Sequence, residues 1–184
     1  YICLPSRWSE FESRMPHHFL RYLFLNSIFP NVNAKILTMD IKSVSSPIGF
    51  FDAAYNQIGL HKLSFIGQSQ SKHPKDHKLQ KSIDNFFSDK GLQSVPTMDL
   101  QGTEFQLLVW NVLCSIPRGS TASYRSIAEQ IGSPNASRAV GTACKLNPIP
   151  LFIPCHRVVK QDHSIGQFAL GIKNKKFLLE MESL

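Results

Sequence analysis

The apolar positions in the first half of the chain change from an irregular alternation to a helical spacing. Residues 44–66 are rich in β-prone residues on both sides of Asn56-Gln57, which favours a hairpin of two strands. The polar stretch 67–77 is expected to be a mobile loop. Apolar residues then recur at helical spacing, and Gly91 stands where a C-terminal cap belongs, so an amphipathic helix is predicted over 78–90. These apolar residues are Leu79, Ile83, Phe86 and Phe87.

A capping box marks the start of the first helix in the second half. Thr103 and Gln106 have the spacing at which each side chain bonds the backbone N–H of the other. Apolar residues at helical spacing follow, and Pro117 and Gly119 bring this helix to an end. The segment 96–102 before it is expected to join the two halves of the chain.

Two shorter helices are expected next, separated by a glycine. Ser123 can cap a helix that stops at Gly132, and Ser133 can cap the following one with Pro134 in its first turn. Helix, tight turn and helix form the outline of a helix-turn-helix motif. In the last helix, Gly141 and other small residues would let the axis approach another surface closely, which we interpret as contact with nucleic acid. The alternative is a tightly packed core helix with a solvated Arg and Lys.

The best candidate nucleophile is Cys155. The apolar run 151–153 suits a buried strand, and the segment Pro154-Cys155-His156-Arg157 follows it. A thiol beside an imidazole and a guanidinium lies in a positive field, which favours the thiolate. In an extended backbone Cys155 and His156 would point to opposite sides, so proton transfer between them needs a turn or a bridging water. The alternative is a buried cysteine beside a surface histidine; Cys114 and Cys144 are expected to be core thiols.

Composition narrows the class of protein. With 184 residues, of which 42% are hydrophobic, the chain suits one medium domain or two small ones with a packed core. It has no uninterrupted apolar run of about 18 residues, so no membrane span is expected. Basic residues outnumber acidic ones by 20 to 13. This excess favours polyanionic partners, although ordinary soluble surfaces carry similar excesses.

Cysteine usage indicates a reducing compartment. The four cysteines are too few and too irregularly spaced for a disulfide scaffold. Cys3 with His17 and His18 is the only loose cluster of metal-ligating residues in the sequence, and we expect no metal site there.

The second half of the chain resembles the O6-alkylguanine-DNA alkyltransferase family. The match covers residues 102–184 in the family's order, and its Pro-Cys-His-Arg centre is highly specific. Residues 43–66 look like the family's more variable N-terminal half, whereas 1–38 match nothing. The matching segments are Gly102-Thr103-Glu104-Phe105-Gln106, Val109-Trp110, Ile116-Pro117-Arg118-Gly119, Ser123-Tyr124, Ile127-Ala128, Arg138-Ala139-Val140-Gly141, Asn147-Pro148 and Ile153-Pro154-Cys155-His156-Arg157-Val158.

The resemblance implies an α+β fold with two domains. Residues 39–98 would form an N-terminal β-hairpin or sheet with a helix, RNase H-like in architecture. Residues 99–184 would form a C-terminal helical domain that carries the helix-turn-helix, binds DNA and accepts the alkyl group. Residues 1–38 are expected to be an extension of unknown role.

The resemblance also implies a DNA repair protein that takes an alkyl group from the O6 atom of guanine onto its own Cys155, irreversibly and once per molecule. No cofactor is expected. His156 would act through water as the base and Glu182 would orient it, in keeping with the general logic of nucleophile, base and orienting group. Three further residues would serve the reaction: Tyr124 would assist the leaving guanine, Asn147 would brace the active-site turn, and Lys175 would lie near the site.

The implied partner is double-stranded DNA that contains O6-alkylguanine. A base inside a duplex cannot reach a buried thiol, so the family flips the nucleotide out. Arg138 would enter the stack from a helix docked in the minor groove, unlike the major-groove docking of most such motifs. The residues expected to contact DNA are Tyr124, Arg125, Ser133, Arg138, Gly141 and Gln161.

The loop after the nucleophile departs from the family's pattern. Phe168 keeps the ring of the usual tyrosine but loses its hydroxyl, and Leu170 adds bulk at the expected pocket mouth. Methyl groups are therefore expected to be accepted better than large O6 substituents. The substrate pocket would be lined by Val158, Phe168 and Ala169. The zinc ligands of some relatives cannot be matched, so no metal is expected. We expect the protein to be a monomer. We expect it in a bacterial cytoplasm in preference to a nucleus.

Three other functions fit the sequence less well than alkyl transfer. A non-catalytic sensor of alkylated bases would have lost its cysteine, and Cys155, His156 and Glu182 together argue against that. A helix-turn-helix transcription factor would ordinarily need a further regulatory or DNA-binding domain, of which 1–101 give no sign. A papain-like protease fits worse, because its catalytic Cys and His are distant in sequence.

Overall fold

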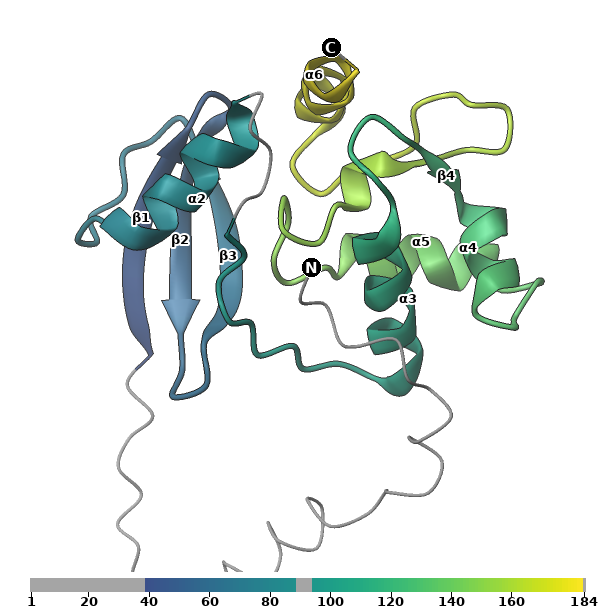
Figure 1. Cartoon of the computed structure of the whole chain (residues 1–184), viewed down its shortest axis with the longest axis horizontal. Helices are drawn as coiled ribbons and strands as arrows, with labels where there is room; N and C mark the ends of the chain where they lie inside the picture. Colours follow the sequence, from purple (N-terminus) through teal and green to yellow (C-terminus); the bar gives the residue numbers. More distant parts are fainter. Residues whose placement is uncertain (1–38, 89–93, 184) are drawn as a thin grey trace, which may run out of the picture. The chain divides into compact units, whose positions relative to one another are not determined.

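We describe the protein from a computed structural model in which residues 39–88 and 94–183 are placed (Figure 1). Met39–Leu184 forms one compact unit. The predicted N-terminal extension, the loose cluster of Cys3, His17 and His18, and the predicted cap at Gly91 lie outside the described residues. The predicted α+β class is confirmed, and the expected boundary between residues 98 and 99 stays a prediction. In the described part, no helix has the length and apolar character needed to cross a membrane.

The N-terminal half contains a three-stranded antiparallel sheet in the order β1-β2-β3. The prediction of two strands was wrong, because the chain also turns at Pro47-Ile48 and pairs Ser46 with Gly49. The extra strand was missed since only Val44 of its seven residues is buried, which leaves almost no apolar alternation. The strands are β1 (Asp40–Ser46), β2 (Gly49–Tyr55) and β3 (Leu60–Gly67).

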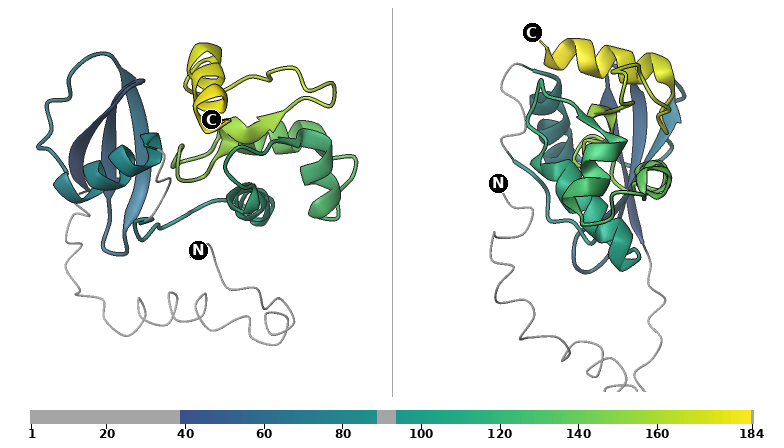
Figure 2. Two further views of the ribbon diagram at one scale, coloured as in Figure 1. Left: turned by 45° about the horizontal axis from the view of Figure 1, so that its top comes forward. Right: turned by 90° about the vertical axis from the view of Figure 1, so that its right-hand side faces the viewer.

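One helix, α2 (His77–Phe87), covers a face of this sheet (Figure 2). The side chain of Asp76 caps its N-terminus by accepting hydrogen bonds from the backbone N–H groups of Lys78 and Leu79. Gln80 bonds the backbone N–H and C=O of Ser45 at 2.9 and 2.8 Å, which fixes the helix against β1. The predicted helix is confirmed at its start and ends earlier than expected.

The C-terminal half contains the predicted helices and a short parallel pair of strands. The capping boxes at Thr103 and Ser123 are both formed. The cap predicted at Ser133 was wrong: Ser133 instead closes a turn by accepting the backbone N–H of Ala136, and the next helix begins at Ser137. The elements are α3 (Glu104–Ser115), β4 (Ala122–Ser123), α4 (Tyr124–Gln130), α5 (Ser137–Lys145), η2 (Cys155–Arg157), β5 (Val158–Val159) and α6 (Ile172–Glu182).

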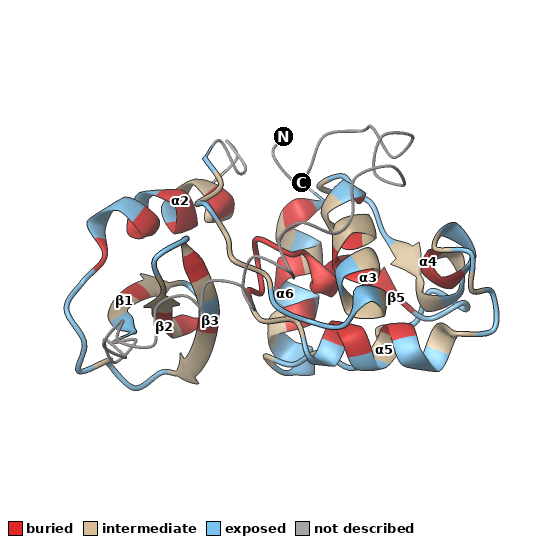
Figure 3. Ribbon diagram, turned by 90° about the horizontal axis from the view of Figure 1, so that it is seen from below, coloured by how far each residue is buried: buried red, intermediate tan, exposed pale blue. Residues whose placement is uncertain are grey.

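Helices α4 and α5 pack on each other as the predicted helix-turn-helix, with Gly132 in the left-handed conformation between them. Helix α3 supports α5, because the indole Nε1–H of Trp110 donates to the carbonyl of Ala143 at 2.9 Å. Figure 3 shows α5 with a buried stripe and exposed residues along the same helix. The exposed side of α5 is therefore available to a partner, while its inner side belongs to the core.

The strand predicted over 151–153 was wrong. Leu151 has a φ of 76°, so the chain reverses there, and the backbone N–H of Ile153 donates to the carbonyl of Ile149 at 3.0 Å. The run is fully inside the core, as its apolar character predicts, but as a compact turn. The turn delivers the chain directly into η2, the short 3₁₀ helix that begins at Cys155.

Candidate active site

Asn147 holds the turn that leads to Cys155. Its side-chain carbonyl accepts the backbone N–H of Ile149 at 3.0 Å, and its amide donates to the carbonyl of Ile153 at 2.8 Å. The same amide lies 3.0 Å from the sulfur of Cys155 and donates to it. Asn147 therefore closes the turn and contacts the candidate nucleophile with a single side chain, in keeping with its predicted bracing role.

Next to the cysteine, η2 turns His156 and Arg157 towards the C-terminal helix. His156 is fully buried, and its Nε2 lies 3.1 Å from Oε1 of Glu182 in α6. Arg157 donates to both oxygens of the same carboxylate, from Nε and Nη2, at 2.8 Å each. The turn required between Cys155 and His156 is thus present. Glu182 binds both His156 and Arg157, which are adjacent in the sequence.

The ionisation of Glu182 fixes the tautomer of His156. Burial by itself would raise the pKa of Glu182, but the hydrogen bonds from His156 and Arg157, together with the charge of the guanidinium, outweigh burial and lower it to about 2. An ionised carboxylate only accepts hydrogen bonds, so Nε2 of His156 carries the hydrogen and Nδ1 carries the lone pair. Among the described residues, no side chain or backbone group is hydrogen-bonded to Nδ1.

His156 is neutral at pH 7. Burial lowers its pKa, the charges of Arg157 and Lys175 act in the same direction, and the contact with Glu182 opposes them without reversing the shift. A neutral imidazole with a free lone pair is the form that accepts a proton. The pair of His156 and Glu182 can therefore act as a base and its orienting group.

Cys155 is a thiol in the resting protein. Its burial raises its pKa to about 11, although the hydrogen bond from Asn147 and the charge of Lys175 act in the opposite direction. The prediction of a thiolate favoured by the adjacent Arg157 was wrong, because Glu182 neutralises that guanidinium and because the sulfur is withdrawn from water. The thiol must consequently lose its proton during the reaction.

Lys175 connects α6 to the two segments that flank the site. The side chain is fully buried, and its Nζ donates to the carbonyls of Val158 at 2.5 Å and Gln167 at 3.4 Å. Burial lowers its pKa, an effect that the nearby thiols oppose. Lys175 therefore fixes the backbone on both sides of the site and places a cation near Cys155.

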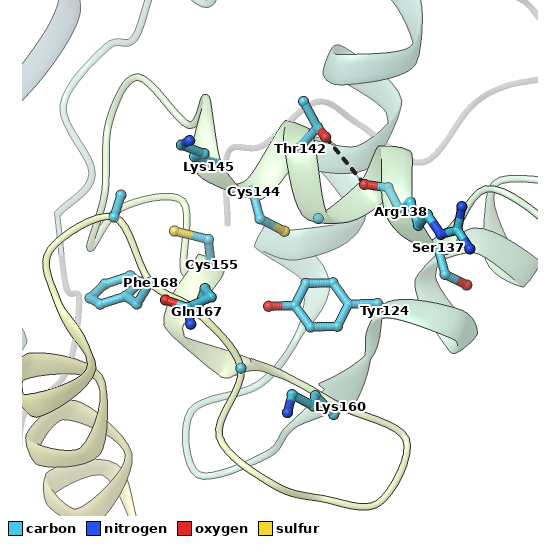
Figure 4. A pocket seen from close by; sticks show the side chains of 13 residues that line it. Tyr124, Ser137, Arg138, Thr142, Cys144, Lys145, Cys155, Lys160, Gln167 and Phe168 are labelled. Carbon is cyan, nitrogen blue, oxygen red and sulfur yellow. Dashed lines mark hydrogen bonds between the residues drawn. The ribbon is translucent and has the colours of Figure 1, made fainter.

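Cys155 opens onto a cavity of about 730 Å³. Figure 4 shows the sulfur between the rings of Phe168 and Tyr124 in that view. Gly166 permits the close approach of the loop to Tyr124, because a Cβ there would lie 2.7 Å from the tyrosine hydroxyl. The cavity is lined by Tyr124, Ser137, Arg138, Gly141, Thr142, Cys144, Lys145, Cys155, Lys160, Gly166, Gln167, Phe168 and Ala169.

The cavity brings together one part of the predicted site and leaves another part outside. Val158, expected in the pocket, has a fully buried side chain and does not line the cavity, and Leu170 packs against the hydrophobic core. Arg125 is exposed on α4 and pairs with Glu129 at 3.1 Å. Ser133 and Gln161 do not line the cavity. The predicted residues that do line the cavity are Tyr124, Arg138, Gly141, Cys155, Phe168 and Ala169.

Several residues of the cavity wall were not predicted. Those on α5 follow the helical spacing of Arg138 and Gly141, so that periodicity contained the signal for them. Lys160 and Gln167 come from the loop after β5, whose path no local pattern encodes. The unpredicted residues are Ser137, Thr142, Cys144, Lys145, Lys160, Gly166 and Gln167.

Within the described ranges 39–88 and 94–183, no group of three or more His, Cys, Asp or Glu residues is placed to hold a metal ion.

Cys144, expected to be a core thiol, is buried on α5 and also lines the cavity. Burial raises its pKa to about 12, so it too is a thiol at neutral pH.

A family model, curated relatives and solved structures that are similar to this chain all carry names of the same family. The family model described as 6-O-methylguanine DNA methyltransferase, DNA binding domain, matches residues 104–184. The methylated-DNA–protein-cysteine methyltransferase of Methanosarcina barkeri is 39% identical over 152 residues, which cover 76% of this chain and 94% of that protein. Its counterpart in Mycobacterium leprae is 36% identical over 149 residues, covering 77% and 90%. The crystal structure of Mycobacterium tuberculosis OGT in complex with DNA aligns with a TM-score of 0.70 at 35% identity, covering 78% of this chain and 92% of that one.

Proposed function

Because the chain belongs to the methylated-DNA–protein-cysteine methyltransferase family, we propose that it repairs DNA by moving an alkyl group from the O6 atom of guanine to its own Cys155. The observation that best supports this role is the position of Cys155. Its sulfur faces a cavity, while the adjacent His156 forms a buried hydrogen-bonded pair with Glu182. Each molecule reacts once, because the thioether formed at Cys155 does not revert to a thiol.

Deprotonation of Cys155 is the step that the buried pair serves. A water molecule between the thiol and Nδ1 of His156 carries the proton to the imidazole, whose lone pair points away from Glu182. Glu182 stabilises the imidazolium that forms. The hydrogen bond from Asn147 and the charge of Lys175 stabilise the thiolate.

The thiolate then attacks the alkyl carbon on O6 of guanine. A C–S bond forms, the C–O bond breaks, and the electron pair of that bond remains on the guanine, which takes up the proton released by the thiol. Tyr124 donates a hydrogen bond to the leaving base: burial and the nearby thiols Cys144 and Cys155 raise its pKa to about 12, so it keeps its hydrogen at neutral pH. The products are S-alkylcysteine and unmodified guanine, and no cofactor is consumed.

Double-stranded DNA is the partner. The target nucleotide rotates out of the duplex into the cavity, and α5 docks in the minor groove through its exposed small residues. Arg138 is exposed and lines the cavity from α5, which suits it to fill the space that the base leaves. One molecule acts as a monomer on each damaged base.

The proposed function is tested by incubating the protein with a duplex oligonucleotide that contains one O6-methylguanine. We expect the intact mass of the protein to rise by one methyl group, with the gain on the peptide that holds Cys155. The reaction should stop at one equivalent of DNA. A protein whose mass is unchanged after incubation with excess substrate would contradict the proposal.

Replacement of Arg138 by alanine should slow repair of duplex DNA far more than reaction with the free base O6-methylguanine. Extruding a base costs a few kcal/mol of stacking, so the loss on duplex DNA should be about a hundredfold if Arg138 offsets that cost. The rates of methyl transfer from each substrate to Cys155 measure the effect. Equal losses on duplex and free base would exclude a role for Arg138 in nucleotide extrusion.

A further inference from the structure

The imidazole of His156 is enclosed by two aromatic rings from distant parts of the chain. Phe168, from the loop before α6, lies with its ring centroid 6.3 Å from that of His156 at an interplanar angle of 70°. Phe86, from α2, lies at 5.9 Å and 88°, an edge-to-face contact. Phe86 is fully buried and does not line the cavity. The N-terminal half of the protein therefore contacts the candidate base directly, on a side that the substrate does not reach.

Arg118, in the turn after α3, connects the same end of α2 to the carboxylate of Glu182. Its Nη1 donates to the carbonyl of Phe86 at 2.9 Å and lies 4.0 Å from Oε1 of Glu182. The guanidinium also lies 5.9 Å from the centroid of the Phe86 ring. Carbonyls in the last turn of a helix lack partners within the helix, and a cation there is favourable. One side chain thus satisfies the end of α2 and faces the carboxylate that orients His156.

The backbone of this turn packs against the same two residues. The carbonyl of Ile116 accepts Nη1 of Arg157 at 2.6 Å. Gly119 has a φ of 77°, and a Cβ at this position would lie 3.0 Å from the backbone oxygen of Glu182. The segment 116–119 is therefore fitted closely to the buried group of His156, Arg157 and Glu182.

We propose that Phe86 and Arg118 are positioning residues for the pair of His156 and Glu182, so that the C-terminal end of α2 supports the alkyl-transfer chemistry. This inference rests on the proposed function. Neither side chain lines the cavity, so neither is expected to contact the base. Phe86 holds the plane of the imidazole and keeps water from it, and Arg118 holds α2 and Glu182 at a fixed separation.

The charged groups around His156 determine how its pKa would respond if the contact with Phe86 or Arg118 were lost. Helix α6 presents Glu182 and Lys175, η2 presents Arg157, and the turn after α3 presents Arg118 towards Glu182. Helix α2 contributes only the apolar ring of Phe86 at this point. Removal of that ring would admit water without removing any charge, so protonation of His156 would become easier.

The test is the rate of methyl transfer from O6-methylguanine duplex DNA across a range of pH in two variants, Phe86→Leu and Arg118→Met. We expect each to lower the rate constant by about tenfold, less than the ~10²-fold that a misplacement of about 1 Å can cost, because neither side chain contacts the reacting atoms. In Phe86→Leu the acid limb of the pH–rate profile should also move to higher pH, because a more solvated imidazole gains a proton more easily. Arg118→Lys, which keeps the charge and a donor, should recover most of the rate.

Phe51→Leu provides the matched control. Phe51 is fully buried in the same half and packs on Phe65 at 5.1 Å. This variant should lose stability in urea unfolding while keeping the wild-type pH–rate profile, which separates positioning from general destabilisation.

Two results would overturn the inference while leaving the proposed function intact. One is a wild-type rate and profile in both Phe86→Leu and Arg118→Met, and the other is an equal displacement of the profile in Phe51→Leu. If Phe86→Leu does not fold, the comparison of Arg118→Met with Arg118→Lys decides the question: equal rates in these two variants would overturn the inference. Failure of the wild-type protein to take up a methyl group would instead reject the proposed function on which the inference rests.

Discussion

Replacement of Cys155 by alanine is expected to abolish methyl uptake completely, whereas Cys144→Ala should still take up one methyl group. Both thiols line the same cavity, and burial raises the pKa of both, to about 11 for Cys155 and about 12 for Cys144. Of these two thiols, Cys155 accepts a hydrogen bond from Asn147 and adjoins His156, the proposed base, whereas Cys144 lies on α5. Activation by a neighbouring base, rather than exposure to the cavity, therefore distinguishes the acceptor.

The measurement is peptide mass analysis of wild type, Cys155→Ala, Cys144→Ala and the double variant after incubation with duplex O6-methylguanine. The expected pattern is methylation of the peptide with Cys155 in wild type and in Cys144→Ala, with none in the other two. Methyl transfer to the peptide with Cys144 in Cys155→Ala would show that the cavity alone suffices for the reaction. That result would exclude the proton relay as the source of selectivity.

Replacement of Glu182 is expected to cost both stability and rate. Glu182→Ala leaves Arg157 buried without its carboxylate, and breaking a buried ion pair by removing one partner costs about 3–5 kcal/mol of unfolding free energy. Glu182→Gln keeps the shape of the side chain but removes the charge that stabilises protonated His156. General base catalysis contributes typically about 10²–10⁴-fold, so the rate of methyl transfer should fall within that range.

The effect of pH on stability follows from the same carboxylate. The pKa of Glu182 is lowered from 4.5 to about 2 in the folded protein, so the unfolded chain takes up a proton first as the pH falls. The stabilisation from Glu182 is complete above about pH 4.5 and is lost between that value and about pH 2. Urea unfolding at several pH values should show this loss in wild type and a flatter dependence in Glu182→Gln.

Glu180→Gln is the matched control on the same helix. Glu180 and Lys176 form an ion pair of 3.8 Å in which both side chains are 66% exposed. Surface pairs of this kind contribute about 0–1 kcal/mol, so this variant should keep nearly full stability and the wild-type rate. A wild-type rate in Glu182→Gln as well would remove Glu182 from the mechanism.

The helices of the C-terminal half were predictable because their ends are determined locally. The bonds of the capping boxes at Thr103 and Ser123 join residues three positions apart, so the sequence contains both partners within one turn. The prediction of a cap at Ser133 was wrong because another local interaction forms there. The carbonyl of Ser133 accepts the backbone N–H of Ala136 in a turn, and the helix begins only at Ser137. Local patterns therefore predicted the existence of these helices more accurately than the residue at which one of them begins.

The turn around Leu151 was not predictable from its residues. A β-branched or large apolar residue rarely adopts a left-handed conformation, and three apolar residues in a row resemble a buried strand. Asn147 holds the turn closed through hydrogen bonds to both of its sides, and the core covers it. Tertiary packing thus outweighed the local preference at the segment that positions the nucleophile.

The sequence by itself determined the candidate nucleophile and the candidate base, because Cys155 and His156 are adjacent and belong to a specific motif. It also determined the helices, whose hydrogen bonds are local. Only the tertiary structure decided the protonation states and the supports of the site. Burial makes Cys155 a thiol, Glu182, 26 positions away, sets the tautomer of His156, and Phe86 reaches the imidazole from the other half of the chain. Desolvation and contacts of this kind depend on which distant segments meet, and no local pattern contains that information.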